Sequence, residues 1–140
     1  MLRYTFLLLI SIMPALKGFS TDKTTTPPIK VITITVSAGG FIVMNGDTLM
    51  TDALANELKQ RLWRSYLGNG RMYDQIKLVT NGQVMMGEKG AVLDAIKDAQ
   101  EKALKELCIE KHKKPFEELS AAQQKKIRQQ FPVLFQELHW

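Results

Sequence analysis

Cysteine and histidine are scarce in this sequence of 140 residues, which contains one cysteine, Cys108, and two histidines. A single cysteine cannot form an internal disulfide, so the fold is not a disulfide-bonded scaffold. The cysteine count therefore does not indicate whether the protein works in a reducing or an oxidising compartment. A structural zinc site needs four ligands, and the scarcity of thiol and imidazole groups argues against one.

The sequence also lacks an apolar run of membrane-spanning length. Residues 4–16 carry no charge, but this stretch has thirteen residues, whereas a spanning helix needs about 20 apolar residues. Arg3 precedes the run, Lys17 closes it, and small residues lead to Ser20, a pattern typical of an export signal cleaved there. We predict that residues 1–20 are a signal peptide or a short membrane anchor, either of which places the remainder outside the cytoplasm; a buried helix is the alternative.

A strong excess of one charge is absent as well. The net charge is +5, and Arg3 and Lys17 supply two of these charges, which leaves +3 for residues 21–140. That excess is mild for a nucleic-acid-binding protein. Apolar residues make up 45% of the chain and charged residues 24%, close to the usage of ordinary globular domains, so wholesale disorder is excluded. The length suits one domain that buries about two thirds of its unfolded surface.

Residues 21–29 are threonine-rich and end near two prolines, which predicts an extended linker. From Lys30 the pattern alternates with period two and contains many β-branched residues, which predicts a strand. Gly39-Gly40 permits a reversal, residues 41–44 form the returning strand, and Asn45-Gly46 supplies a second tight turn. The glycines therefore indicate a hairpin meander rather than a ligand loop.

Two helices are expected after the meander. We predict that Thr51 caps the first, which carries an apolar stripe and ends at Gly68-Asn69-Gly70. A strand over residues 75–79 follows, and then a longer helix over residues 88–110. The economical arrangement is an α+β fold, in which a small mixed β-sheet has two main helices on one face. This domain spans residues 30–109, with a helical C-terminal extension over residues 110–140.

The stretch TNGQVMMGEKG places Gly82 and Gly87 at the spacing of a phosphate-binding loop, with Lys89 nearby. A Walker loop needs lysine directly after its last glycine, and then a serine or threonine that binds magnesium. Here Glu88 follows the glycine and Gly90 follows the lysine. We therefore predict no nucleotide site.

Cys108 and His112 are four residues apart, so one helix would place them on the same face as a nucleophile and base or as two metal ligands. The simpler interpretation is a buried cysteine and a cation at the helix C-terminus. Asp94 and Asp98 are also four apart, but neighbouring lysines and glutamate favour a solvated surface over an acid/base pair. We predict no catalytic, cofactor-binding or metal site.

The C-terminal extension contains the densest basic region of the chain. Acidic residues interrupt it, and no aromatic side chains alternate with the lysines as in proteins that stack single-stranded bases, so nucleic acid is not an expected partner. Ser120 is expected to cap a helix. The apolar residues after it are expected to pack back on the domain; a partner-binding role is the alternative. The basic residues are Lys111, Lys113, Lys114, Lys125, Lys126 and Arg128.

From residue 30 to about residue 103 the chain resembles the periplasmic domain of the ExbD/TolR biopolymer-transport proteins. ITITVSAGGFIVMNGDTL is similar to that family's strand, turn and second strand, LANELKQRL to its first helix, and IKLVTNGQVMMG to its central strand and turn. Leu93-Asp94 matches an apolar residue and aspartate that the family places after this turn. The C-terminal extension resembles one carried by a subset of the family.

Two departures from the family pattern affect what the resemblance implies. Motor members carry a membrane aspartate that takes up and releases protons, but residues 4–16 contain no acid, so this chain as given cannot perform that step. Asn81 stands where the family usually has an acidic residue.

The resemblance implies a non-enzymatic envelope subunit of an ion-gradient-driven transport system, which binds partners and transmits force. The implied partners are an ExbB/TolQ-like channel subunit, a TonB/TolA-like envelope protein, peptidoglycan and a second copy of the chain. The implied location is the periplasm. The alternatives are a freely soluble secreted or periplasmic binding protein that keeps the fold without motor coupling, and an envelope enzyme, which rests only on Cys108 and His112.

Overall fold

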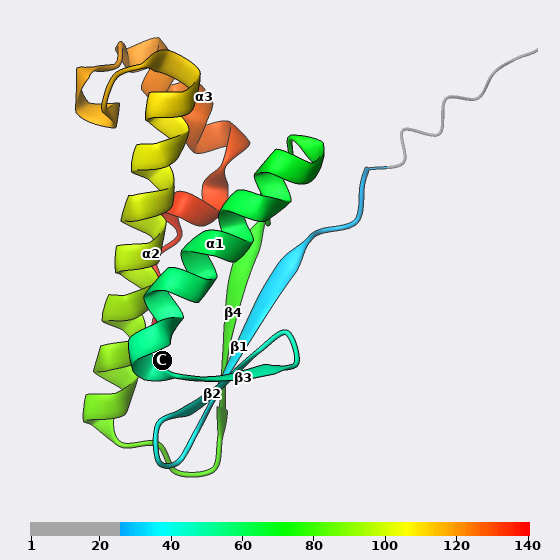
Figure 1. The fold of residues 1–140 in the computed structure, drawn as a ribbon, viewed down its shortest axis with the longest axis vertical. Helices are drawn as coiled ribbons and strands as arrows, with labels where there is room; N and C mark the ends of the chain where they lie inside the picture. The colour runs from blue at the N-terminus through cyan, green and yellow to red at the C-terminus, as the bar shows by residue number, and fades with distance from the viewer. Residues whose placement is uncertain (1–25) are drawn as a thin grey trace, which may run out of the picture.

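The computed structural model describes residues 26–140, so the signal or anchor prediction for residues 1–20 lies outside the described residues. Residues 26–140 form a four-stranded sheet and three α-helices (Figure 1). In chain order the elements are β1 (Val31–Ser37), β2 (Phe41–Met44), β3 (Asp47–Met50), α1 (Thr51–Asn69), β4 (Gln75–Asn81), α2 (Met86–His112), the 3-10 helix η1 (Phe116–Glu118), α3 (Ala121–Gln130) and the 3-10 helix η2 (Pro132–Phe135).

The sheet is mixed and has the strand order β3-β2-β1-β4. β1 pairs antiparallel with β2 and parallel with β4, and Ile34 lies opposite both Met44 and Leu78. The parallel pairing extends over seven residue pairs, from Val31 opposite Gln75 to Ser37 opposite Asn81. β1 therefore lies inside the sheet, hydrogen-bonded on both sides.

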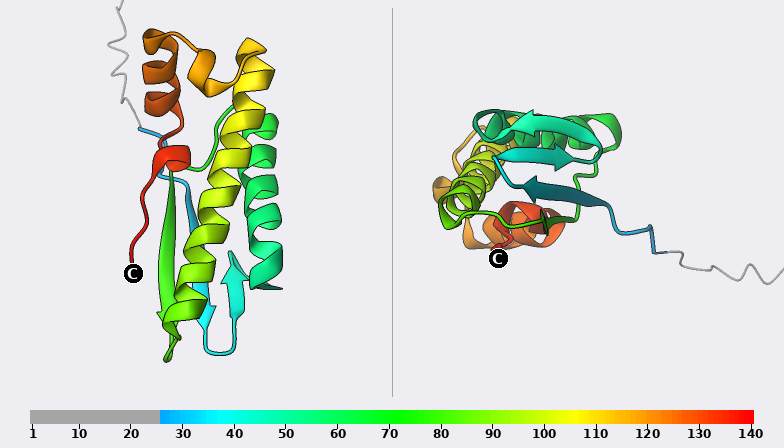
Figure 2. Two further views of the ribbon diagram at one scale, coloured as in Figure 1. Left: turned by 90° about the vertical axis from the view of Figure 1, so that its left-hand side faces the viewer. Right: turned by 90° about the horizontal axis from the view of Figure 1, so that it is seen from below.

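One face of the sheet packs against α1 and α2 (Figures 1 and 2). The alternation in β1 is the cause, since every second side chain is fully buried while those between are half-buried. α1 contributes an apolar stripe that repeats every four residues, formed by Leu54, Leu58 and Leu62. α2 contributes the small residues Ala99 and Ala103, which let the two helices approach closely. This arrangement confirms the predicted α+β fold with two main helices on one face. The fully buried residues include Ile32, Ile34, Val36, Ile42, Met44, Leu54, Leu58, Leu62, Val92, Ala99 and Ala103.

The C-terminal extension covers the part of α2 that projects beyond the sheet. A helix of 27 residues is about 40 Å long, whereas a strand of seven residues covers about 23 Å. The apolar side chains on the last turns of α2 therefore need another cover, and Leu119, Ile127 and Phe131 from the extension supply it. The prediction that the apolar C-terminal end packs back on the domain is confirmed: Val133 and Leu134 are buried.

The predicted helix boundaries are accurate to about two residues, with one error in capping. α1 ends where the glycines predict, and Gly70 adopts φ 71 there, a left-handed conformation that glycine accepts readily. Thr51 is not the N-cap, because the helix already begins at this residue and its hydroxyl donates to the carbonyl of Gly40, 3.3 Å away. Met50 occupies the cap position without a side-chain hydrogen bond.

Ser120 does cap α3, as predicted. Its Oγ accepts a hydrogen bond from the Gln123 backbone N–H at 3.2 Å, and the Gln123 side chain accepts one from the Ser120 N–H at 3.1 Å. These two bonds satisfy amides that the first turn of a helix leaves unpaired.

We expect Ser120→Ala to lower the free energy of unfolding by about 1 kcal/mol, the usual effect of losing a capping hydroxyl. Chemical denaturation followed by circular dichroism measures the change. Ser120→Asp restores an oxygen acceptor at the same position and serves as the control. Equal losses in both variants would show that the cap contributes nothing.

Candidate functional site

The point where the linker meets β1 is held by a compact polar cluster, which we call the tether junction and define as Lys30, Ser65, Arg71 and Asp74. The Lys30 N–H donates to Oδ2 of Asp74 at 2.6 Å, and the Asp74 N–H donates back to the Lys30 carbonyl at 2.8 Å. Arg71 Nη2 donates to the same Asp74 oxygen at 2.6 Å and to the Pro28 carbonyl at 2.9 Å. One carboxylate thus joins the incoming chain to the loop before β4.

The loop after α1 places these groups. Gly70 turns the chain out of the helix, the Asn69 Oδ1 accepts the Arg71 N–H at 3.0 Å, and the Ser65 hydroxyl donates to the Arg71 carbonyl at 2.8 Å. The Lys30 ammonium donates to the Ser65 hydroxyl at 2.6 Å. The same ammonium lies 4.7 Å from the centre of the Tyr73 ring, within the range of a cation–π contact. Side chains from α1 and from the loop before β4 therefore fix the start of β1.

Along the β4 edge of the sheet, residues 131–140 form a strap beside α2 and β4 (Figure 2). The Gln136 side chain pairs with β4 as another strand would: its Oε1 accepts the Ile76 N–H at 2.8 Å, and its Nε2 donates to the Ile76 carbonyl at 2.9 Å. Gln100, which is 7% exposed, donates to the carbonyls of Val133 and Gln136 at 2.7 and 3.0 Å. These four bonds attach the strap to both the helix and the sheet.

We expect Gln136→Ala to release the strap from the edge of β4. Both backbone groups of Ile76 lose their partner, so exchange of its amide hydrogen accelerates by a factor of about 10, the equivalent of about 1.4 kcal/mol. Hydrogen exchange followed by NMR measures the rate. Glu137→Ala, at the exposed neighbouring position, is the control. An unchanged Ile76 rate would contradict the role assigned to Gln136.

A groove of about 400 Å³ lies between α2 and the strap. It is lined by Asp94, Lys97, Gln100, Glu101, Glu137 and His139 together with apolar side chains. Asp98, four residues from Asp94, forms an ion pair with Lys102 at 2.7 Å on the helix surface. This pairing agrees with the solvated surface predicted for the two aspartates.

At the N-terminus of α2, the segment that contains Gly82 and Gly87 has a different geometry from a Walker loop. Gly82 lies in the turn with φ 78, and Gly87 lies inside the helix. The Glu88 carboxylate accepts the Met85 N–H at 3.2 Å, so a negative charge occupies the helix N-terminus. Lys89 lies near Trp140, its ammonium 5.6 Å from a ring centre and its carbonyl accepting the indole N–H at 3.0 Å.

Cys108 is fully buried in the hydrophobic core, as the simpler interpretation of the Cys108–His112 pair predicts. Burial raises the pKa of its thiol, and the nearby Glu117 carboxylate adds to the rise. His112 is the last residue of α2 and is half-buried. Within residues 26–140, no group of three or more histidine, cysteine, aspartate or glutamate side chains is placed to hold a metal ion.

The Cys108 thiol is expected to react with a disulfide reagent about 100 times more slowly in the folded chain than in urea, because reaction requires local opening. Ala121→Cys places a second thiol at an exposed position as the internal control.

The Cys108 thiol keeps its proton to a higher pH in the folded state than in the unfolded state. The free energy of unfolding should therefore fall as the pH rises above the usual thiol pKa of 9.0. A Cys108→Ala variant that shows the same fall would assign it to another group.

Comparison with known protein families, with curated proteins and with solved structures found no match for this chain. Among the helices of residues 26–140, none combines the length and apolar character needed to cross a membrane.

Sequence reasoning did not find the residues that organise the tether junction and the strap. Asp74, Gln100 and Gln136 act on backbone groups 33 to 60 positions away in the chain. A polar side chain that binds a distant backbone group leaves no periodic pattern in the sequence.

Proposed function

We propose that this chain is an ExbD/TolR-like envelope subunit of an ion-gradient-driven biopolymer transport system. It acts as a non-enzymatic domain that binds partners and transmits force from residues 1–20. The resemblance of residues 30–103 to the periplasmic domain of that family is the first support. Its partners are an ExbB/TolQ-like channel subunit, a TonB/TolA-like envelope protein, peptidoglycan and a second copy of the chain.

The observation that carries the proposal is the way the linker meets the sheet. Residues 26–30 lead directly into β1, which lies between β2 and β4. A pull on the linker loads the β1–β4 pairing along the strand direction, and its hydrogen bonds resist together rather than one after another. The tether junction holds the first residue before this strand. This geometry suits a rigid body that receives force at one point.

The open face of the sheet offers room for partners. The half-buried Thr33 and Thr35 lie on the side of β1 opposite the helices, and Thr35 lies between Val43 and Val79 of the neighbouring strands. Apolar residues also gather toward the end far from the linker, where Phe41 pairs with Met50 and both are more than half exposed. We place partner contacts on these two surfaces.

The main alternative is a freely soluble binding protein that keeps the fold without motor coupling, and the N-terminus distinguishes the two. The test is the intact mass of C-terminally tagged protein from fractionated cells. A full-length species in the membrane fraction supports the proposal. A soluble species that begins near Thr21 would establish the alternative, because a cleaved chain has no physical link to a channel in the membrane.

A further inference from the structure

We propose that the helical end of the domain binds the surface of a membrane containing anionic lipids. We call this surface the basic end and define it as residues 111–128, which comprise the last two residues of α2, η1 and most of α3. The inference rests on the proposed function, because an anchored chain presents this surface to the membrane that holds it. It adds a partner, the lipid headgroups, which the proposed function does not include.

The charge of the described residues is concentrated on the basic end. Residues 111–128 contain six lysine or arginine residues and two glutamates, a net charge of +4. The remainder of residues 26–140 contains ten basic and eleven acidic residues, a net charge of −1. The mild excess seen in the whole sequence is therefore a local one in the folded chain.

These cations are exposed and are not paired with acids. The four ion pairs found among residues 26–140 are Lys59–Glu106, Arg61–Asp47, Arg71–Asp74 and Lys102–Asp98, all outside the basic end. Lys114, Lys125 and Lys126 are exposed, and their ammonium groups make no hydrogen bond to other groups among residues 26–140. Their full charge is thus available to an anionic surface.

Two cations of the basic end instead stabilise its shape. The Arg128 guanidinium lies 4.6 Å from the centre of the Phe135 ring and 5.3 Å from that of Phe116. The Lys111 ammonium lies 5.0 Å from the centre of the Phe131 ring. These contacts fix η1 and α3 against α2, so the exposed lysines project from a rigid support.

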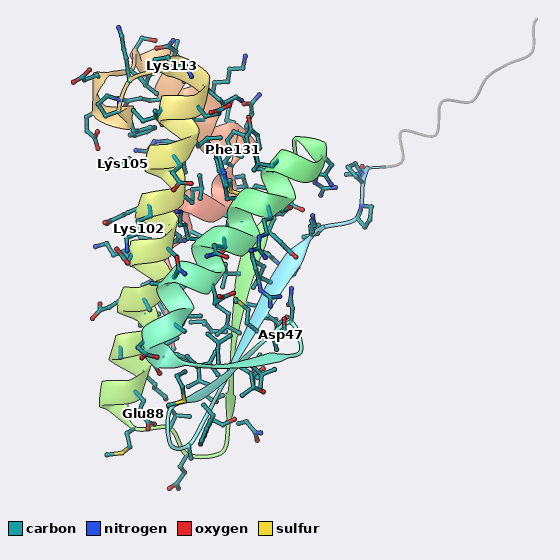
Figure 3. All side chains as sticks on the ribbon, viewed as in Figure 1. Asp47, Glu88, Lys102, Lys105, Lys113 and Phe131 are labelled. Atoms are coloured by element: carbon teal, nitrogen blue, oxygen red, sulfur yellow. The ribbon has the colours of Figure 1, made fainter. Side chains whose placement is uncertain are left out.

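The fold places the basic end at the same end of the molecule as the linker. β1 runs away from the linker and β4 is parallel to it, so α2, which follows β4, returns toward the end where the chain enters. Figures 1 and 2 show residues 26–30 emerging at the same end of the molecule as α3. Figure 3 shows Lys113 at this end of α2 and Glu88 at the other. A membrane that holds the N-terminus therefore lies next to the basic end.

Exposed apolar side chains accompany the cations. Leu67, near the end of α1, is 62% exposed, and Ile109, in the last turn of α2, is 44% exposed. Both helices finish at the end of the molecule where the linker enters, the upper end in Figure 1. Cations and exposed aliphatic side chains at one end of a molecule suit the headgroup region of a bilayer, where charge attraction and apolar burial act together. Nucleic acid fits less well, because Phe116 and Phe135 are covered by Arg128 and offer no stacking surface.

The test uses the full chain with Ala121→Cys, labelled there with a fluorophore, while the buried Cys108 stays unlabelled. The labelled chain is reconstituted into vesicles of phosphatidylcholine alone, or of phosphatidylcholine and phosphatidylglycerol in equal parts. Nitroxide-labelled headgroups in each vesicle quench a fluorophore that lies at the surface. The test variant carries Lys114→Gln, Lys125→Gln and Lys126→Gln.

The control carries Lys77→Gln, Lys97→Gln and Lys102→Gln, which change the net charge equally at exposed positions away from the basic end. We expect strong quenching in anionic vesicles, weak quenching in neutral ones and loss of the signal at high salt. Because each basic residue near an anionic surface contributes about fivefold in affinity, the test variant should lose most of its quenching, and the control should keep it.

Three results would overturn the inference: equal quenching in neutral and anionic vesicles, equal loss in the two triple variants, or binding of a DNA fragment as tight as that of the anionic vesicles at the same salt. Whether the chain floats together with the neutral vesicles distinguishes a failure of this inference from a failure of the proposed function. A chain that fails to float with them has no membrane anchor, which contradicts the anchored subunit. A chain that floats but stays unquenched in anionic vesicles contradicts only the lipid contact.

Discussion

Replacing Leu58 with alanine is expected to lower the free energy of unfolding by about 3 kcal/mol, within the range measured for buried leucine-to-alanine changes. The Leu58 side chain is fully buried at the centre of the α1 stripe, in the core between the sheet and α2. Truncation leaves a cavity that a close-packed interior closes only in part. A loss of this size is a large share of the stability of a domain this small.

Leu67→Ala provides the matched control, since it makes the same chemical change on the same helix at a position that is 62% exposed. We expect a change of less than about 0.5 kcal/mol there. Urea denaturation of both variants, followed by far-UV circular dichroism, measures the two values. Similar losses at Leu58 and Leu67 would contradict the packing of α1 on the sheet.

Asp74→Ala is expected to lower the free energy of unfolding by about 2 kcal/mol, because one carboxylate accepts two charge-assisted or short hydrogen bonds. Its Oδ2 receives the Lys30 N–H and the Arg71 guanidinium, both at 2.6 Å. Without this side chain, Lys30 keeps only the backbone hydrogen bond from the residue 74 N–H to its carbonyl, so the start of β1 is held less firmly to the loop that precedes β4. Amide exchange should accelerate at Lys30 and leave Ile42, in β2, nearly unchanged.

Asp94→Ala is the control for this prediction, because Asp94 is exposed on α2 and forms no ion pair within residues 26–140. Denaturation in urea gives the stability change, and hydrogen exchange locates it. Equal effects of Asp74→Ala and Asp94→Ala would show that the tether junction does not hold the start of β1. The proposed path of force through this strand would then lose its structural basis.

The sequence predicted the elements whose residues repeat with a clear period. The alternation of Ile32, Ile34 and Val36 predicted the first strand, and the four-residue stripe predicted the first helix; both are confirmed. Strand β3 was not assigned, because its four residues are mostly exposed and lack an apolar alternation. The two extra residues at each end of α2 were missed because helix ends carry weak signals.

The contacts that hold the linker and the strap were not predictable in the same way. Gln100 and Gln136 are ordinary polar residues by composition, and their roles follow from the position of carbonyl and amide groups that only the fold brings near. The error at Thr51 has the same cause: a hydroxyl expected to serve its own helix instead meets the Gly40 carbonyl of the neighbouring turn. Local rules fail where a distant backbone group competes.

The most direct test of the proposed function is co-purification of the tagged full chain from mildly crosslinked membranes of its own host, with partners identified by mass spectrometry. The account predicts an ExbB/TolQ-like channel subunit in amounts comparable to the bait. The same subunit should be absent when residues 1–20 are replaced by a cleavable export signal. Recovery of the chain without any such channel subunit, or equal recovery of the subunit with the cleaved chain, would contradict the account.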